Sequence, residues 1–119
     1  MQIKKVYTKV NPGLLYDEIR DFVQKQGVVV DEAKLETYSM PTDSSSFIYR
    51  GTLTFTSNEN SKAGKECLRA HIVGVPNQET KLIIDTDDKL FGPEKVALLL
   101  EDIDFIFSSY EEQPDSAED

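Results

Sequence analysis

The amino-acid sequence predicts an α+β domain in which a curved antiparallel sheet carries both of its helices on one face. Two segments repeat apolar residues with the period of a helix, and five others have the composition and alternation of strands. The segments follow the order β-α-β-β-β-β-α. Short polar loops join the four consecutive strands, which is typical of antiparallel pairing. A chain of 119 residues has room for one such domain.

The first helix is predicted over residues 12–26. Asn11 can accept hydrogen bonds from the free N–H groups of the first turn, and Pro12 loses no hydrogen bond at the first helical position. Gly27 supplies a stop signal. Apolar residues at offsets of four, seven and eight form one stripe. The stripe consists of Leu15, Ile19, Phe22 and Val23.

The second helix is predicted to begin at Gly92-Pro93-Glu94 and to end at Tyr110. Its apolar arc is wide, which predicts a helix deeply embedded against the sheet. The predicted stripe contains Val96, Leu99, Leu100, Ile103, Phe107 and Tyr110, widened by Ala97, Leu98 and Ile106. Residues 111–119 carry five acidic side chains. They are predicted to form a disordered acidic tail after a domain spanning 1–110.

The strands are predicted over residues 3–10, 28–40, 47–56, 66–75 and 81–87. The polar segment PTDSSS at 41–46 is predicted to be a turn or loop, and 57–65 a hairpin loop. This order of elements resembles the half-domain of TATA-box-binding proteins and, more loosely, the helix-grip lipid-binding proteins. The chain lacks the basic, apolar-wedge sheet face that a minor-groove binder needs.

The net charge argues against a nucleic-acid partner, and the short apolar runs argue against a membrane. The chain has 13 basic and 22 acidic residues, a net charge of -9, and such a surface repels phosphate backbones. No apolar run approaches the ~20 residues that span a bilayer, and no signal peptide is evident. The single cysteine, Cys67, excludes an intramolecular disulfide. We therefore expect a cytoplasmic protein with neither metal nor cofactor.

One segment resembles a catalytic motif. LIIDTDDKLF at 82–91 is similar to the nucleophile motif of haloacid-dehalogenase-type phosphatases, in which Asp85 would attack phosphorus and Asp87 would act as acid/base. Asp88 and Lys89 stand where that family has Thr or Ser, and too few residues follow to build its parallel α/β body. We therefore interpret these aspartates as the turn-forming end of a strand.

Cys67 and His71 do not form a catalytic dyad if their strand is regular. Four residues of strand separate them by roughly 13 Å, whereas a nucleophile and its base lie ~3 Å apart. Cys67 is expected to pack as a small hydrophobic residue. Glycine-rich phosphate loops and other compact catalytic signatures are absent from the sequence. We therefore expect a protein that is not an enzyme.

Face alternation also predicts the pairing of the outer sheet face. The predicted partners are Thr52 with His71, Thr54 with Arg69, Thr56 with Cys67, Leu53 with Ala70, His71 with Asp85 and Arg69 with Asp87. Such polar cross-strand pairs contribute ~0.2–1 kcal/mol each. The functional alternative is a small anion site formed by Arg50, Arg69 and His71, although the neighbouring aspartates would offset the arginine charge.

Two apolar sets are candidates for binding. Outward β-branched residues mark an interface if they are contiguous, and here they are Ile48, Val73, Val75 and Ile83. The inner face and the second helix supply residues that suit either a packed core or an apolar pocket. These residues are Phe47, Tyr49, Leu53, Phe55, Leu99, Ile103 and Phe107.

The sequence therefore predicts a non-catalytic protein-interaction or self-association module, with a second copy or another protein as its partner. The alternative is a carrier that holds a small apolar ligand between the C-terminal helix and the sheet.

Overall fold

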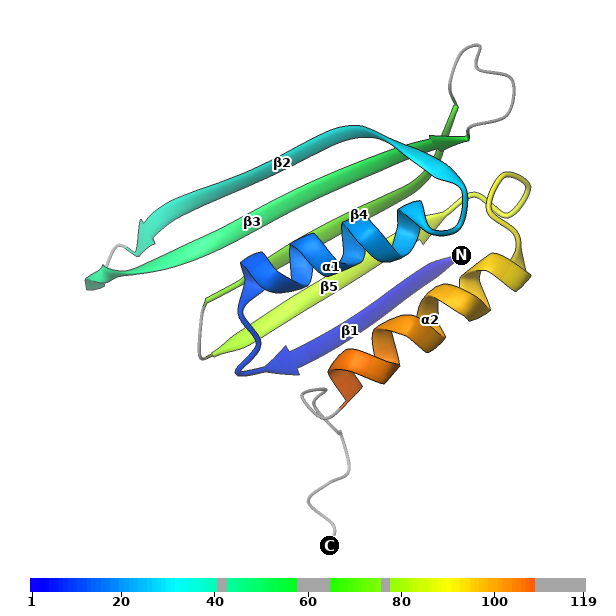
Figure 1. Cartoon of the computed structure of the whole chain (residues 1–119). Coiled ribbons are helices and arrows are strands. Elements are labelled where there is room, and N and C mark those ends of the chain that lie inside the picture. The colour runs from blue at the N-terminus through cyan, green and yellow to red at the C-terminus, as the bar shows by residue number, and fades with distance from the viewer. Residues whose placement is uncertain (41–42, 58–64, 76–77, 109–119) are drawn as a thin grey trace, which may run out of the picture.

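The computed structural model describes residues 1–40, 43–57, 65–75 and 78–108. The predicted tail at 111–119 and most of the predicted loop at 57–65 lie outside these described residues. The element order is β-α-β-β-β-β-α (Figure 1). The elements are β1 (Gln2–Thr8), α1 (Pro12–Gln24), β2 (Val28–Met40), β3 (Asp43–Ser57), β4 (Glu66–Gly74), β5 (Glu79–Thr86) and α2 (Pro93–Phe107).

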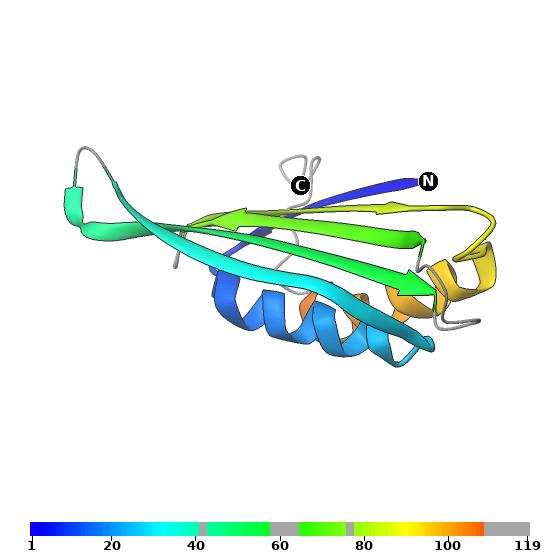
Figure 2. The same cartoon turned by 90° about the horizontal axis from the view of Figure 1, so that it is seen from above.

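The strands form one antiparallel sheet in the order β1-β5-β4-β3-β2. The four consecutive strands pair with their neighbours in sequence. β1 pairs with β5 and forms the edge of the sheet opposite to β2. Figure 2 shows both helices on the same side of the sheet. The α+β class and the antiparallel sheet are therefore confirmed.

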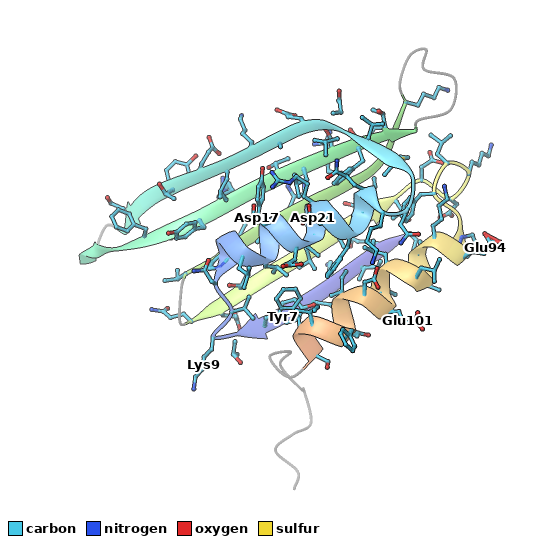
Figure 3. The ribbon with its side chains drawn as sticks, viewed as in Figure 1. Tyr7, Lys9, Asp17, Asp21, Glu94 and Glu101 are labelled. Atoms are coloured by element: carbon cyan, nitrogen blue, oxygen red, sulfur yellow. The ribbon has the colours of Figure 1, made fainter. Side chains whose placement is uncertain are left out.

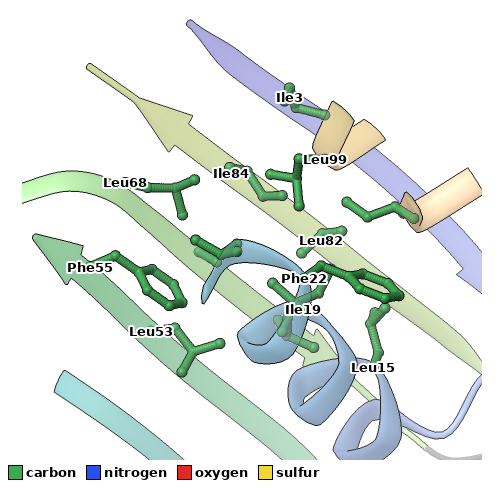
Figure 4. Packing of buried hydrophobic residues seen from close by; sticks show 14 of the residues in the cluster. Ile3, Leu15, Ile19, Phe22, Leu53, Phe55, Leu68, Leu82, Ile84 and Leu99 are labelled. Carbon is green, nitrogen blue, oxygen red and sulfur yellow. The ribbon is translucent and has the colours of Figure 1, made fainter. Parts of the chain in front are cut away.

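The core lies between the sheet and the helices. α1 packs on β2, β3 and β4 and also against α2. Side chains of α1 and of the inner sheet face meet in one hydrophobic cluster (Figure 4). Burial of a large apolar side chain contributes about 1.5–3 kcal/mol, so this cluster is the main source of stability. Its largest fully buried members include Tyr7, Phe55, Phe91, Phe107, Leu15, Ile19 and Leu53.

α1 begins and ends close to its predicted bounds. The Asn11 side chain accepts hydrogen bonds from the N–H groups of Gly13 (2.8 Å) and Leu14 (3.2 Å), which satisfies two free donors of the first turn. The helix ends at Gln24, and Gly27 takes a φ of +93° that favours glycine. The predicted stripe of Leu15, Ile19, Phe22 and Val23 is buried.

The prediction that the second helix is deeply embedded is wrong. Its buried residues form one narrow stripe, whereas Leu98 is 51% exposed and Phe105 is 86% exposed. The acidic side chains Glu94 and Glu101 point away from the sheet (Figure 3). α2 lies at the side of the molecule near β1, so only one side of the helix meets the core. The buried residues are Val96, Leu99, Ile103 and Phe107.

The predicted pairing of β3 with β4 is confirmed over most of its length. Thr52 lies opposite His71, Thr54 opposite Arg69, and Leu53 opposite Ala70. The last predicted pair is wrong, because Thr56 lies opposite Glu66 instead of Cys67. A bulge leaves Cys67 without an opposite residue on β3, and its side chain is buried.

The predicted pairing of β4 with β5 is shifted by two residues. Arg69 lies opposite Asp85 and His71 opposite Ile83, whereas the sequence predicted Asp87 and Asp85. The Gln78 N–H donates to the Val75 carbonyl oxygen at 2.9 Å, and this short connection lets β5 begin at Glu79. A shift of two keeps the same face inward, so the predicted inner residues are still buried.

β2 and β3 form a long hairpin that extends beyond the other strands (Figure 2). β3 already begins at Asp43, where the sequence predicted a turn or loop over 41–46. The pairing of Met40 with Asp43 continues the ladder into this polar segment, whose composition alone does not indicate a strand. Farther along, Gly51 leaves space for Tyr16, because an added Cβ would lie 2.6 Å from the Tyr16 ring.

We expect Gly74→Ala to lower the free energy of unfolding by about 1–3 kcal/mol. An added Cβ would lie 2.8 Å from the Cα of Thr80, and this backbone cannot move away as a flexible side chain could. Urea denaturation followed by circular dichroism measures the change. Gly92→Ser is the control, because its added Cβ would lie 3.6 Å from the nearest atom, its φ is -74°, and serine is a favoured N-cap for α2. Equal midpoints for the two variants would contradict the prediction.

Candidate functional site

The seven predicted ligand-lining residues do not form one group. Leu53 and Phe55 of β3 belong to the core cluster together with Leu99, Ile103 and Phe107 of α2. Phe47 and Tyr49 lie outside that cluster, farther along β3, with Phe47 44% exposed and Tyr49 half-buried. The structure thus brings five of the seven together as tightly buried core residues. Their role in ligand binding stays a prediction.

An ion pair under α2 was missed by the sequence reasoning. The Lys5 Nζ lies 3.2 Å from the Asp104 Oδ1, and the Lys5 side chain is only 14% exposed. Beside this pair, the ring of Tyr7 on β1, which is labelled in Figure 3, lies 5.8 Å from the ring of Phe107 on α2. The signal was available, because Ile3, Lys5 and Tyr7 share one face by simple alternation. These contacts anchor α2 to β1.

The three predicted anion-binding residues are not convergent. Arg69 donates two hydrogen bonds to the Glu66 carboxylate, at 2.9 and 2.8 Å. This contact raises the pKa of Arg69 and lowers the pKa of Glu66. Arg50 lies opposite Glu36 on β2, roughly four residues along the sheet from Arg69, a spacing of about 13 Å. His71 lies between them. Arg69 is therefore already paired with an acidic side chain, and Arg50 lies opposite one in the strand register.

Each aspartate of the phosphatase-like segment contacts a nearby structural group. Asp85 accepts a hydrogen bond from the Gln2 side chain at 2.9 Å. Asp87 accepts from the backbone N–H groups of Lys89 and Leu90, and these bonds lower the pKa of Asp87. Asp88 lies 3.3 Å from the amino group of Met1. Within the described ranges, no three metal-ligating side chains come together.

The outward apolar residues form a diagonal band across β3, β4 and β5. We define the outer band as Ile48, Val73, Val75 and Ile83, all of which are half-buried. Val73 lies opposite Arg50 on one side and Lys81 on the other. Ile48 and Ile83 are its diagonal neighbours, within the 7–8 Å reach of such positions. The band is therefore contiguous along the diagonal, with charged residues on both sides.

Further exposed apolar residues lie on the two faces of the long hairpin. Leu35 of β2 is 41% exposed, and Tyr38 of β2 and Phe47 of β3 are exposed to a similar extent. Only Tyr38 shares a face with the outer band, because it lies opposite Ile48, whereas Leu35 and Phe47 are on the inner face of the hairpin. A hydrogen bond with Glu36 raises the pKa of Tyr38. The sequence reasoning did not single out Leu35 or Tyr38, because alternation alone does not reveal which strand lies at an edge.

Comparison with known proteins yields no relative for this chain. No family model, no curated protein and no solved structure matches it. Of the described helices, neither α1 nor α2 is long and apolar enough to cross a membrane. The fold and the surfaces described above are therefore the basis for any functional conclusion.

We expect Cys67 to react slowly with a thiol reagent in the folded protein. Its side chain is 1% exposed, and burial raises the pKa of the thiol, so little reactive thiolate is available. Titration with Ellman's reagent measures the reaction rate with and without urea. A concentration of about 6–8 M urea unfolds a stable domain. Full reactivity without urea would mean that the bulge does not bury Cys67.

Proposed function

We propose that the protein is a non-catalytic interaction module whose outer sheet face binds a protein, either a second copy of the chain or a different protein. The outer band carries this proposal, because both helices lie on the opposite side of the sheet and leave the band uncovered (Figure 2). An apolar strip with Arg50 and Lys81 beside it has the apolar centre and polar rim that protein interfaces share.

The ionisable groups on the same face favour binding over catalysis. Arg69 is held by Glu66, and Asp85 is held by Gln2. A catalytic site needs a nucleophile or a proton-transfer group aimed at a shared point, whereas these contacts tie Arg69 and Asp85 to their neighbouring side chains. The element order still resembles that of TATA-box-binding half-domains, but this resemblance carries no part of the proposal.

We expect Val73→Asp to abolish protein binding by the outer face. The new carboxylate would lie between Lys81 and Arg50, so the fold should tolerate it while the centre of the outer band becomes charged. Two readouts are needed: solution mass from sedimentation equilibrium, and the proteins that the purified chain retains from an extract of its source cells.

Val29→Asp is the matched control, because Val29 is an exposed valine on the same face at the other end of the hairpin. The proposal predicts that this variant behaves like the unmodified protein in both assays. If Val73→Asp changes neither the mass nor the retained proteins, the outer face is not the binding surface.

A further inference from the structure

β2 is an edge strand with an accessible backbone. It is the last strand in the sheet order, so one side of its backbone faces no other described strand. All residues from Glu32 to Ser39 are exposed or half-buried. An edge of this length presents a row of N–H and C=O groups that can pair with another strand.

The sequence of β2 is complementary to itself in one antiparallel register. When two copies are related by a two-fold axis through Leu35, Lys34 of each copy lies opposite Glu36 of the other. Both charge pairs lie on the outer face, where Lys34 and Glu36 already share a side with Thr52 and Arg50 of β3. On the other face, Leu35 lies opposite its own counterpart. Opposite charges across a strand pair are stabilising, and like charges are destabilising.

The neighbouring registers are less favourable. The outer faces of the two copies stay on the same side of the joined sheet only if the pairing shifts by an even number of residues. Each such shift moves the two-fold axis by one residue. An axis through Lys34 would put Lys34 opposite Lys34 and Glu32 opposite Glu36. An axis through Ala33 would restore opposite charges but would draw the bulge at Asp31 into the new ladder. The register centred on Leu35 uses only the regular part of the strand.

The inner face also fits this register. Leu35 lies opposite Gly51, where its Cδ1 is within 3.5 Å of an added Cβ, and Tyr16 covers the same glycine. Leu35 is therefore held at the margin of the core while 41% of its surface stays exposed. A second Leu35 would cover this exposed part, which adds apolar burial to the backbone hydrogen bonds.

We propose that a second copy of the chain pairs antiparallel along β2, with the two-fold axis at Leu35, so that two sheets join into one continuous sheet. This inference goes beyond the proposed function, because it uses an edge and leaves the outer band free. In the joined sheet, the outer bands of both copies lie on the same face and form a bivalent surface.

Charge exchange at β2 tests the pairing. We expect the unmodified protein to form a dimer and Lys34→Glu to weaken it at least about tenfold, because two attractive oppositions become repulsive. Lys4→Glu is the matched control, since it makes the same charge change on the exposed face of the other edge strand, β1. Sedimentation equilibrium over a concentration series, at low salt, measures each dissociation constant.

Mixing two variants tests whether dimerisation can be restored, which a general loss of stability would not allow. Lys34→Glu and Glu36→Lys each place like charges opposite one another in their own dimers. A mixture of the two restores opposite charges at both positions, so the mixed dimer should form. If Glu36→Lys folds poorly beside Arg50, Leu35→Asp is tested alone as the second disrupting variant, because it places two carboxylates opposite one another at the axis.

Oxidation of a Leu35→Cys variant reports on the register directly. Opposite residues of an antiparallel pair have Cα atoms about 4.5–5.5 Å apart, which suits a disulfide. We expect a covalent dimer from Leu35→Cys and none from Leu98→Cys, which places an exposed thiol on α2. The native Cys67 is buried and should not interfere.

A monomer at all concentrations would overturn the edge pairing and leave the outer-face proposal standing through its extract assay. A dimer that Val73→Asp dissociates and Lys34→Glu does not would overturn the edge pairing and support the outer face instead. Equal cross-linking of Leu35→Cys and Leu98→Cys would also overturn it.

Discussion

Burial of one face of the sheet under α1 and α2 is the interaction on which the rest of the structure depends. Inner residues of β3, β4 and β5 meet both helices in a single cluster. Each large side chain buried there contributes about 1.5–3 kcal/mol, several times the ~0.2–1 kcal/mol of a cross-strand pair on the outer face. The core therefore decides which side of each strand faces inward, and the outer pairs follow from that choice.

Among the described residues, nothing covers the outer face of the sheet or the outer edge of β2. The outer face has a diagonal apolar band between charged residues, and one side of the β2 backbone faces no other strand in the described part of the chain. Both surfaces arise from the same cause, because helices that pack on one face of a five-stranded sheet cannot cover its other face or its far edge. Binding at either surface would complete what the fold leaves uncovered.

The sequence predicted features that depend on local alternation, and it failed on features that depend on contacts between distant segments. The pairing of Thr52 with His71 could be predicted because alternation was clear on both strands. The β4–β5 register was wrong by two residues, since a period of two cannot distinguish registers that differ by an even shift. Cys67 was placed on the outer face because a bulge leaves no mark in the alternation pattern. The candidate interface residues were identifiable, but their contiguity depends on the register.

Local sequence patterns were sufficient to predict the helices, the strands and the inward side of most strands. This is because caps, helical stripes and alternation depend on residues that are near neighbours in the chain. Asn11 before Pro12 and the stripe ending at Val23 are examples. Packing between distant segments determined where these elements lie relative to one another. It set α2 beside β1, so that Phe105 faces solvent although the helix is apolar on several sides. It also set β2 at the edge, and an edge is a property of strand order, which no single segment encodes.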